Sequence, residues 1–107
     1  MEPVTVGDAA ARTGWSPRML RYLERAGLVV PRRATSGYRL YGMLELNQLR
    51  SLQELRRRFA VELADIAFAA RLRRDPGLRA AVDTWLAGTE IEALDWEQRK
   101  HERLLAA

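Results

Sequence analysis

The sequence of 107 residues lacks cysteine altogether, contains one histidine, and has Lys100 as the only lysine among its 18 basic residues. The absence of cysteine excludes disulfide bonds, thiolate metal sites and thiol catalysis. No apolar run approaches the roughly 20 residues that span a bilayer, and Met1-Glu2-Pro3 does not open a signal peptide. We therefore expect a cytoplasmic protein that does not associate with membranes. The length allows one domain, or a small domain plus an appendage.

Groups for catalysis and metal binding are also scarce. Ser16, Ser36 and Ser51 are candidate nucleophiles, but the sole histidine, His101, lies in a charged C-terminal segment. The sequence has no glycine-rich phosphate loop and no paired histidine or cysteine ligands. Acidic residues at 90 and 92, and at 95 and 97, are two apart, so they do not face each other on a helix. We predict no catalytic residue, no metal site and no cofactor, and therefore no enzyme.

Positive charge is concentrated in the N-terminal two thirds of the chain. Residues 1–42 hold seven basic and three acidic side chains, and residues 43–75 hold seven and five. Residues 76–107 hold four and six, so the C-terminal third is net negative. Arginine presents a planar fork that suits phosphate or guanine. A GC-rich coding sequence also explains the excess of arginine over lysine, so the placement of the charge, rather than the ratio, predicts an acidic partner.

The first 27 residues predict two short helices joined by a tight turn. Thr5 and Asp8 have capping-box spacing, and Gly14 can end that helix in a left-handed conformation. Ser16-Pro17 starts a second helix with a capping oxygen followed by proline at the first helical position. Gly27 ends it. A basic second helix after a tight turn is typical of the helix-turn-helix motif.

A two-stranded ribbon is predicted directly after these helices. The apolar run Leu28-Val29-Val30 ends at Pro31, and Tyr38-Arg39-Leu40-Tyr41 alternates before Gly42. The polar segment 32–37 lies between them, with a glycine at 37 where a hairpin needs a positive φ. A ribbon in this position is a wing.

Helical periodicity then continues to the C-terminus. Apolar spacing predicts helices over about 43–58 and about 62–73, and Asp75-Pro76 marks a cap-plus-proline boundary. A further helix is expected to end at Gly88, and Thr89 starts a capping-box match for a last helix through roughly Leu105. The fold class is therefore mainly α: a winged helix-turn-helix domain over 1–75, followed by C-terminal helices over 76–107.

The order of these signals resembles the N-terminal DNA-binding domain of MerR-family bacterial transcription regulators. The matching segments span about 4–70 and stand in family order: Val6-Gly7-Asp8-Ala9-Ala10, Thr13-Gly14-Trp15-Ser16, Leu20-Arg21-Tyr22 with Glu24, Gly27-Leu28 with Pro31, Arg32, Ser36-Gly37-Tyr38-Arg39-Leu40-Tyr41, Leu44-Glu45-Leu46 and Leu63-Ala64-Asp65-Ile66. The wing segment from Ser36 to Tyr41 is the most specific of these. The resemblance implies a homodimer that binds a pseudo-palindromic promoter site and distorts it so that RNA polymerase engages both promoter elements.

Four positions depart from the family pattern, and the sequence is short. Met19, Leu23, Gly42 and Ala60 replace a threonine, an aromatic residue, a serine and a glycine that are usual in the family. These changes affect packing or capping. Family members typically continue into an effector-binding domain or carry cysteines, whereas about 30 residues follow Asp75 here. We expect a short form whose sensing apparatus is absent or lies in a partner.

The candidate DNA contacts lie on the second helix and the wing. The start of the second helix enters the major groove in this motif, so Ser16, Pro17 and Arg18 are expected at base edges, with Arg18 the best candidate for direct readout. Arg21 and Tyr22 are expected at phosphates. Arg21 could instead be tied to an acid such as Glu24.

On the wing, Tyr38 and Arg39 resemble the residues that grip the DNA backbone in this family. Arg32 and Arg33 could follow an adjacent phosphate path. Tyr41 is open between DNA contact and packing. Trp15 is interpreted as a core residue rather than a base-stacking platform, and the arginines at 56–58 as either flanking DNA contacts or compensation for the helix dipole.

The C-terminal segment is interpreted as a partner surface. Its candidate dimerisation residues are apolar and follow helical spacing: Leu78, Val82, Trp85, Leu86, Ile91 and Leu94. Exposed tryptophans would form a costly apolar surface, so burial against a second subunit is expected. The alternative is that the segment folds back on its own domain.

Three functions remain open from the sequence. The first is a dimeric transcriptional regulator of double-stranded DNA. The second is an architectural or excisionase-like DNA-binding protein without ligand sensing, which would assemble cooperatively on direct repeats. The third is a protein-interaction adaptor whose acidic tail docks a protein partner.

Overall fold

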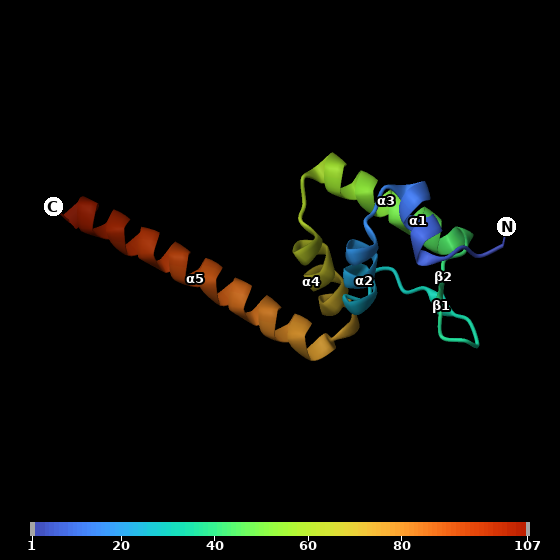
Figure 1. Cartoon of the computed structure of the whole chain (residues 1–107). Helices are drawn as coiled ribbons and strands as arrows, with labels where there is room; N and C mark the ends of the chain where they lie inside the picture. The colour runs from blue at the N-terminus through green and yellow to red at the C-terminus, as the bar shows by residue number, and fades with distance from the viewer. Residues whose placement is uncertain (1, 107) are drawn as a thin grey trace. The chain divides into compact units, whose positions relative to one another are not determined.

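A computed structural model describes the backbone of residues 2–106, and the side chains within that range other than those of 90–95, 102 and 104–106. The elements are α1 Val6–Thr13, α2 Pro17–Arg25, β1 Arg32–Arg33, β2 Arg39–Leu40, α3 Met43–Phe59, α4 Leu63–Arg74 and α5 Pro76–Ala106 (Figure 1). The chain forms two compact units, Met1–Ala70 and Arg71–Ala107, that divide within α4. The fold is mainly helical with a small antiparallel wing, which confirms the predicted fold class.

The helix-turn-helix forms as the capping residues predict. The side-chain oxygen of Thr5 accepts a hydrogen bond from Asp8 N at 3.4 Å, and that of Ser16 accepts one from Met19 N at 3.1 Å. Gly14 ends α1 in the left-handed conformation, with φ of 81°. These bonds satisfy backbone donors that have no partner inside the helix. The turn between α1 and α2 is thus fixed by local chemistry.

The wing is shorter than predicted. β1 and β2 pair antiparallel, with Arg32 opposite Leu40 and Arg33 opposite Arg39, around a turn in which Gly37 has φ of 93°. The prediction of a strand at Leu28-Val29-Val30 is wrong. The amides at 28 and 29 donate instead to Leu23 O, at 2.9 and 3.4 Å, and so complete the end of α2.

The core of the first unit combines residues from the helices and both ends of the ribbon. Its buried apolar members are Ala9, Trp15, Leu20, Leu23, Val29, Tyr41, Leu46, Leu49, Leu52 and Leu63. Trp15 is 5% exposed and its Nε1 donates to Leu49 O at 2.8 Å, which confirms its interpretation as a core residue. Tyr41 pairs with Val4 through two backbone hydrogen bonds of 2.8 Å, which join the N-terminal segment to the end of the wing.

The connection from α3 to α4 contains one strained residue. Ala60 ends α3 in the left-handed region with φ of 53° and ψ of 39°, and it is the only non-glycine with a positive φ among the described residues. α4 then starts with a bond that the sequence reading overlooked: Glu62 N donates to Asp65 Oδ2 at 3.0 Å. Asp65 therefore supplies the carboxylate half of a capping box.

α5 is one continuous helix, so the predicted break at Gly88 is wrong (Figure 1). A glycine inside a helix is less favourable than alanine by about 1 kcal/mol, which is too little to stop a helix flanked by good helix formers. Thr89 does not cap a new helix, because its hydroxyl donates to Trp85 O at 3.0 Å. The predicted start is confirmed, since Asp75 Oδ1 accepts from Leu78 N at 3.0 Å. Within the described residues, no helix has both the length and the apolar character that a membrane span requires.

Candidate nucleic-acid interface

α2 places a polar N-terminal surface over an apolar anchor. Leu20 and Leu23 are fully buried and hold one side of the helix in the core. On the other side Arg18 and Arg21 are exposed, as are the two residues that start the helix, Ser16 and Pro17. Three of these four side chains carry groups that can donate hydrogen bonds. The start of α2 therefore has the exposure that base-edge contacts need.

A hollow of about 700 Å³ lies beside α2 and includes the start of α4 in its wall. Its lining combines exposed arginines with apolar and acidic residues: Ser16, Arg18, Met19, Tyr22, Arg25, Arg56, Glu62, Leu63 and Ala64. Tyr22 is half-buried and packs against the core, so its ring is partly occupied by packing. Arg18 and Arg25 form the exposed basic part of this surface.

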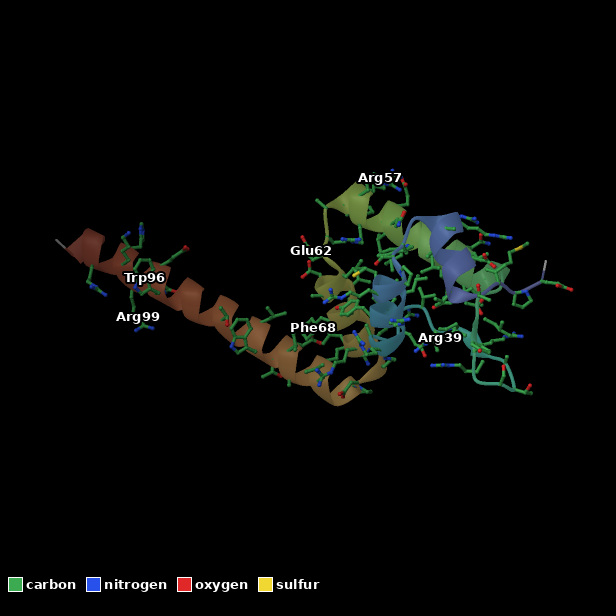
Figure 2. The ribbon with its side chains drawn as sticks, viewed as in Figure 1. Arg39, Arg57, Glu62, Phe68, Trp96 and Arg99 are labelled. Carbon is green, nitrogen blue, oxygen red and sulfur yellow. The ribbon has the colours of Figure 1, made fainter. Side chains whose placement is uncertain are left out.

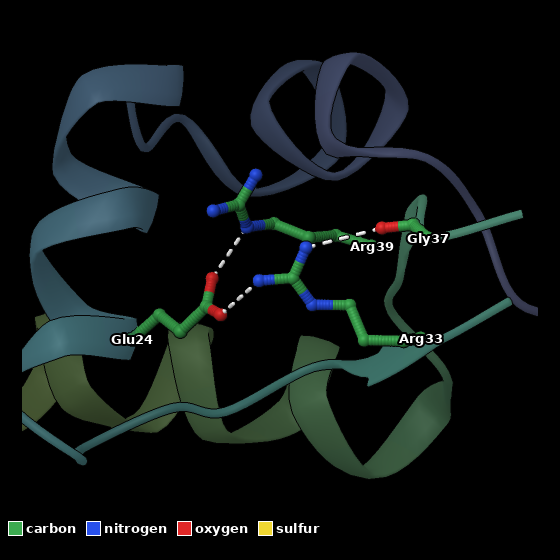
Figure 3. A network of polar contacts seen from close by, with 4 residues as sticks. All are labelled: Glu24, Arg33, Gly37 and Arg39. Carbon is green, nitrogen blue, oxygen red and sulfur yellow. Dashed lines mark hydrogen bonds and ion pairs between the residues drawn. The ribbon is translucent and has the colours of Figure 1, made fainter.

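A single carboxylate on α2 holds the wing. Glu24 Oε1 accepts a hydrogen bond from Arg33 Nη2 at 2.6 Å, and Glu24 Oε2 accepts one from Arg39 Nε (Figure 3). Arg33 Nη1 also donates to Gly37 O at 3.1 Å, which extends the network to the turn of the hairpin. Arg33 and Arg39 are directly opposite each other in the ladder, where like charges repel. Glu24 compensates that repulsion.

The network changes the pKa values of Glu24 and Arg39. Burial raises the pKa of Glu24, but hydrogen bonds from Arg39 and Arg33, together with their charges, outweigh burial and leave the pKa below its ordinary value. The hydrogen bond to Glu24 raises the pKa of Arg39. Glu24 and Arg39 are therefore both charged near neutral pH.

Arg39 remains able to bind an anion while it is bonded to Glu24. Only its Nε is used, and within the described part of the chain its two Nη groups have no hydrogen-bond partner (Figure 3). Arg39 borders a hollow of about 330 Å³, whose lining comes from the start of α1, from α2 and from the wing: Thr5, Val6, Gly7, Arg21, Gly37, Tyr38 and Arg39. Two arginines from different elements thus line one concave surface of a size and charge suited to a phosphate group.

Two of the sequence-based interpretations change with this geometry. Tyr41 is fully buried in the core, with 0% of its surface accessible, so its role is packing and the expected DNA contact is wrong. Burial also raises the pKa of its hydroxyl. The proposed tie between Arg21 and Glu24 is not formed, because both carboxylate oxygens of Glu24 bind wing arginines. Arg21 is therefore available on the surface.

The remaining wing residues point to different sides of the ribbon. Neighbouring residues on a strand face opposite ways, so Arg32 lies on the other face from Arg33 and Arg39. Arg32 is exposed, and Tyr38 is 73% exposed beside the turn. The sequence reading missed Glu24 as the centre of the site. Two arginines placed across a hairpin were the signal that an acid from elsewhere would be needed.

The arginines at the end of α3 have partners within the domain. Arg56 lies over the Trp15 ring at 5.5 Å, Arg57 pairs with Glu54, and Arg58 lies over the Phe59 ring at 5.2 Å. Figure 2 shows Arg57 close to the end of α3 and Arg39 at the wing. Packing and pairing thus account for these three residues without DNA.

The candidate dimerisation residues lie on α5 and differ in exposure. Leu78 and Val82 are half-buried, whereas Trp85 is 66% exposed and Leu86 is 49% exposed. The side chains of Ile91 and Leu94 lie outside the described residues. Trp96 also projects from α5, with Lys100 Nζ 5.3 Å from its ring (Figure 2). Among the described side chains, no three acidic or histidine residues form a metal-binding group.

Comparison with known proteins shows similarity to bacterial transcription regulators. The family model "MerR family regulatory protein" matches residues 5–41. The HTH-type transcriptional regulator HmrR of Rhizobium leguminosarum bv. viciae is 38% identical over 53 residues, which cover 50% of this chain and 41% of that protein. The chain spans between 37% and 56% of the length of the curated relatives it matches.

Solved structures with the same fold cover nearly the whole chain. The HTH-type transcriptional regulator SkgA from Caulobacter crescentus superposes with a TM-score of 0.56 at 31% identity, over 84% of this chain and 67% of that one. HiNmlR, a MerR family regulator lacking the sensor domain and bound to promoter DNA, has a TM-score of 0.56 at 23% identity, over 96% of this chain and 84% of that one. The second likeness concerns the fold alone.

Proposed function

The chain belongs to the MerR family of regulatory proteins, and we propose on this basis that it binds promoter DNA through α2 and the wing and regulates transcription. The observation that carries the proposal is the placement of exposed Arg18 and Arg21 on α2 beside a wing whose Arg39 is held by Glu24. Basic donors from two elements thereby lie on the surface of one unit. That HiNmlR was solved on promoter DNA is consistent with the use of this fold for DNA.

Each basic residue has a distinct role in this proposal. Arg18, with Ser16 and Pro17 at the start of α2, reads base edges in the major groove, because the forked guanidinium matches the two acceptors of guanine. Arg21 and Arg39 bind backbone phosphates and fix the register of α2. Tyr38 flanks them. These three residues line the same hollow.

The other proposed contacts are peripheral. Arg32, on the outer face of the ribbon, and Arg33, which is half-exposed and bonded to Glu24, follow the phosphate path beside the wing. Tyr22 reaches DNA only with the exposed part of its ring. We expect these residues to contribute less to affinity than Arg18 and Arg39.

We further propose that α5 forms a homodimer through its apolar side chains. Trp85 and Leu86 are large and exposed on a helix of 31 residues, and such a surface favours association in water. An antiparallel pair would present two α2 helices to a two-fold operator. Bending or untwisting that operator would require a few kcal/mol, which phosphate contacts would offset, before RNA polymerase engages the promoter.

Selection of bound duplexes from a random DNA pool, with the molar mass measured in parallel by light scattering, tests this function. The proposal predicts a pseudo-palindromic sequence with two half-sites and a dimer in solution. Cooperative assembly on direct repeats would contradict the discrete dimer and favour an architectural role. Failure to enrich any sequence, with no salt-sensitive DNA binding, would exclude DNA recognition.

A further inference from the structure

Glu24 occupies a position that is unfavourable for an acid when α2 is considered alone. It lies in the last turn of α2, where the helix dipole presents its negative end. Arg33 and Arg39 are in turn unfavourable when the wing is considered alone, because two like charges face each other in the ladder. Contact between Glu24 and the two arginines compensates both the unfavourable position of the acid at the helix end and the repulsion between the arginines. The helix and the wing are therefore each electrostatically incomplete without the other.

The bonds are arranged to fix the wing rather than merely to neutralise it. The carboxylate of Glu24 accepts hydrogen bonds from Nε of Arg39 and Nη2 of Arg33, and Nη1 of Arg33 donates to Gly37 O in the hairpin turn (Figure 3). A continuous hydrogen-bonded path therefore runs from α2 to the tip of the wing. Arg39 keeps both Nη groups for another anion.

Glu24 is also well placed to remain bonded. Its side chain is 17% exposed, compared with 31% for Arg39 and 48% for Arg33. By contrast, the Glu54–Arg57 pair on α3 is 59% and 79% exposed. Partial removal from water strengthens a charge-assisted hydrogen bond, so the Glu24 contacts are more persistent than those of an ordinary surface pair.

We propose that Glu24 is a positioning residue for DNA recognition: it fixes the wing against α2 so that Arg39 and Arg18 meet DNA in one register, and it thereby increases the preference for the specific site. The inference rests on the proposed function. Non-specific binding depends on total charge and tolerates a loose wing, and the negative charge of Glu24 opposes it. Specific binding requires phosphate and base contacts at fixed separations. Glu24 therefore acts on the two kinds of complex in opposite directions.

The test compares wild type with Glu24→Gln by fluorescence anisotropy on two duplexes. One is the sequence that the wild-type protein selects from the random pool, and the other is the same duplex with its base order scrambled. We expect Glu24→Gln to bind the selected duplex about tenfold more weakly, a loss within the range for residues that share a hydrogen-bond network. The scrambled duplex should be bound as tightly as by wild type or more tightly.

Two controls separate positioning from charge and from folding. Glu54→Gln makes the same change of charge in the more exposed pair on α3, and should alter binding to both duplexes by similar factors. In a background that carries Arg33→Ala and Arg39→Ala, Glu24→Gln should change specific affinity by less than about twofold, because the network is already gone. The active concentration of each variant is set by stoichiometric titration, so partial unfolding does not mimic weaker binding.

Three results would overturn the inference. They are a ratio of the two affinities that Glu24→Gln leaves unchanged, a gain in that ratio, and a tenfold loss on the selected duplex that persists without the two arginines. Failure of the proposed function looks different, because the wild-type protein itself would then not distinguish the two duplexes.

Discussion

Replacement of Ala60 by glycine is expected to stabilise the protein, although it removes a methyl group. Ala60 has φ of 53° and ψ of 39°, and this left-handed conformation is unfavourable for an L-residue with a Cβ by about 1–2 kcal/mol. Glycine avoids that strain but has more conformational entropy in the unfolded chain, worth about 0.4–1 kcal/mol. Ala60 is exposed, so little apolar burial is lost. The net gain in free energy of unfolding should be about 1 kcal/mol.

Urea denaturation followed by circular dichroism measures this gain in free energy of unfolding, and a matched alanine-to-glycine substitution elsewhere serves as the control. Ala69→Gly changes the same atoms at an exposed position in α4 with ordinary helical geometry, and should reduce stability by about 1 kcal/mol. Opposite signs for the two alanines support the left-handed turn after α3. If Ala60→Gly is neutral or destabilising, Ala60 does not hold the left-handed conformation and the account of the connection is wrong.

Three further predictions concern the network, the core and α5. Because the pKa of Glu24 is lowered on folding, its contribution to stability is complete above its ordinary pKa of 4.5 and is lost as the pH falls through the lowered pKa. The difference in unfolding free energy between wild type and Glu24→Gln should therefore shrink on acidification, and urea titrations at several pH values measure it. Trp15→Phe removes the hydrogen bond from the indole Nε1 to Leu49 O and should destabilise by about 0.5–1.5 kcal/mol in thermal unfolding, and no loss would contradict that bond. Trp85→Arg places charge on the exposed apolar surface of α5 and should lower the molar mass seen by light scattering to that of the monomer, while a dimer that persists would place the interface elsewhere.

Local chemistry made the first two helices predictable from the sequence. Thr5, Ser16 and Gly14 act within a few residues of themselves, so their spacing indicates where α1 starts and ends and where α2 starts. The same holds for Asp75 at the start of α5. Errors occurred where local signals were weak or were opposed by a stronger requirement. Gly88 weakens a helix by too little to end it.

The parts of the site that depend on distant residues could not be derived from spacing. Val29 is a β-branched residue of the kind favoured in strands, but it is buried, and its amide donates a hydrogen bond to Leu23 O at the end of α2. Tyr41 ends the segment Tyr38-Arg39-Leu40-Tyr41, which is predicted as a strand of the wing, yet its backbone pairs with Val4 and its ring enters the core. Glu24 could have paired with Arg21 on its own helix. Only the folded wing shows that two arginines bind it together.

The salt dependence of DNA binding by Arg39→Ala tests most directly the claim that α2 and the wing form the DNA-binding surface. In anisotropy titrations on the selected duplex, a lost phosphate contact should weaken binding and reduce the slope of log affinity against log salt concentration by about 1. Arg18→Ala should instead relax preference at one base position. Arg79→Ala, an exposed arginine on α5, should leave the slope unchanged. If Arg39→Ala and Arg18→Ala behave like Arg79→Ala, this surface does not bind DNA.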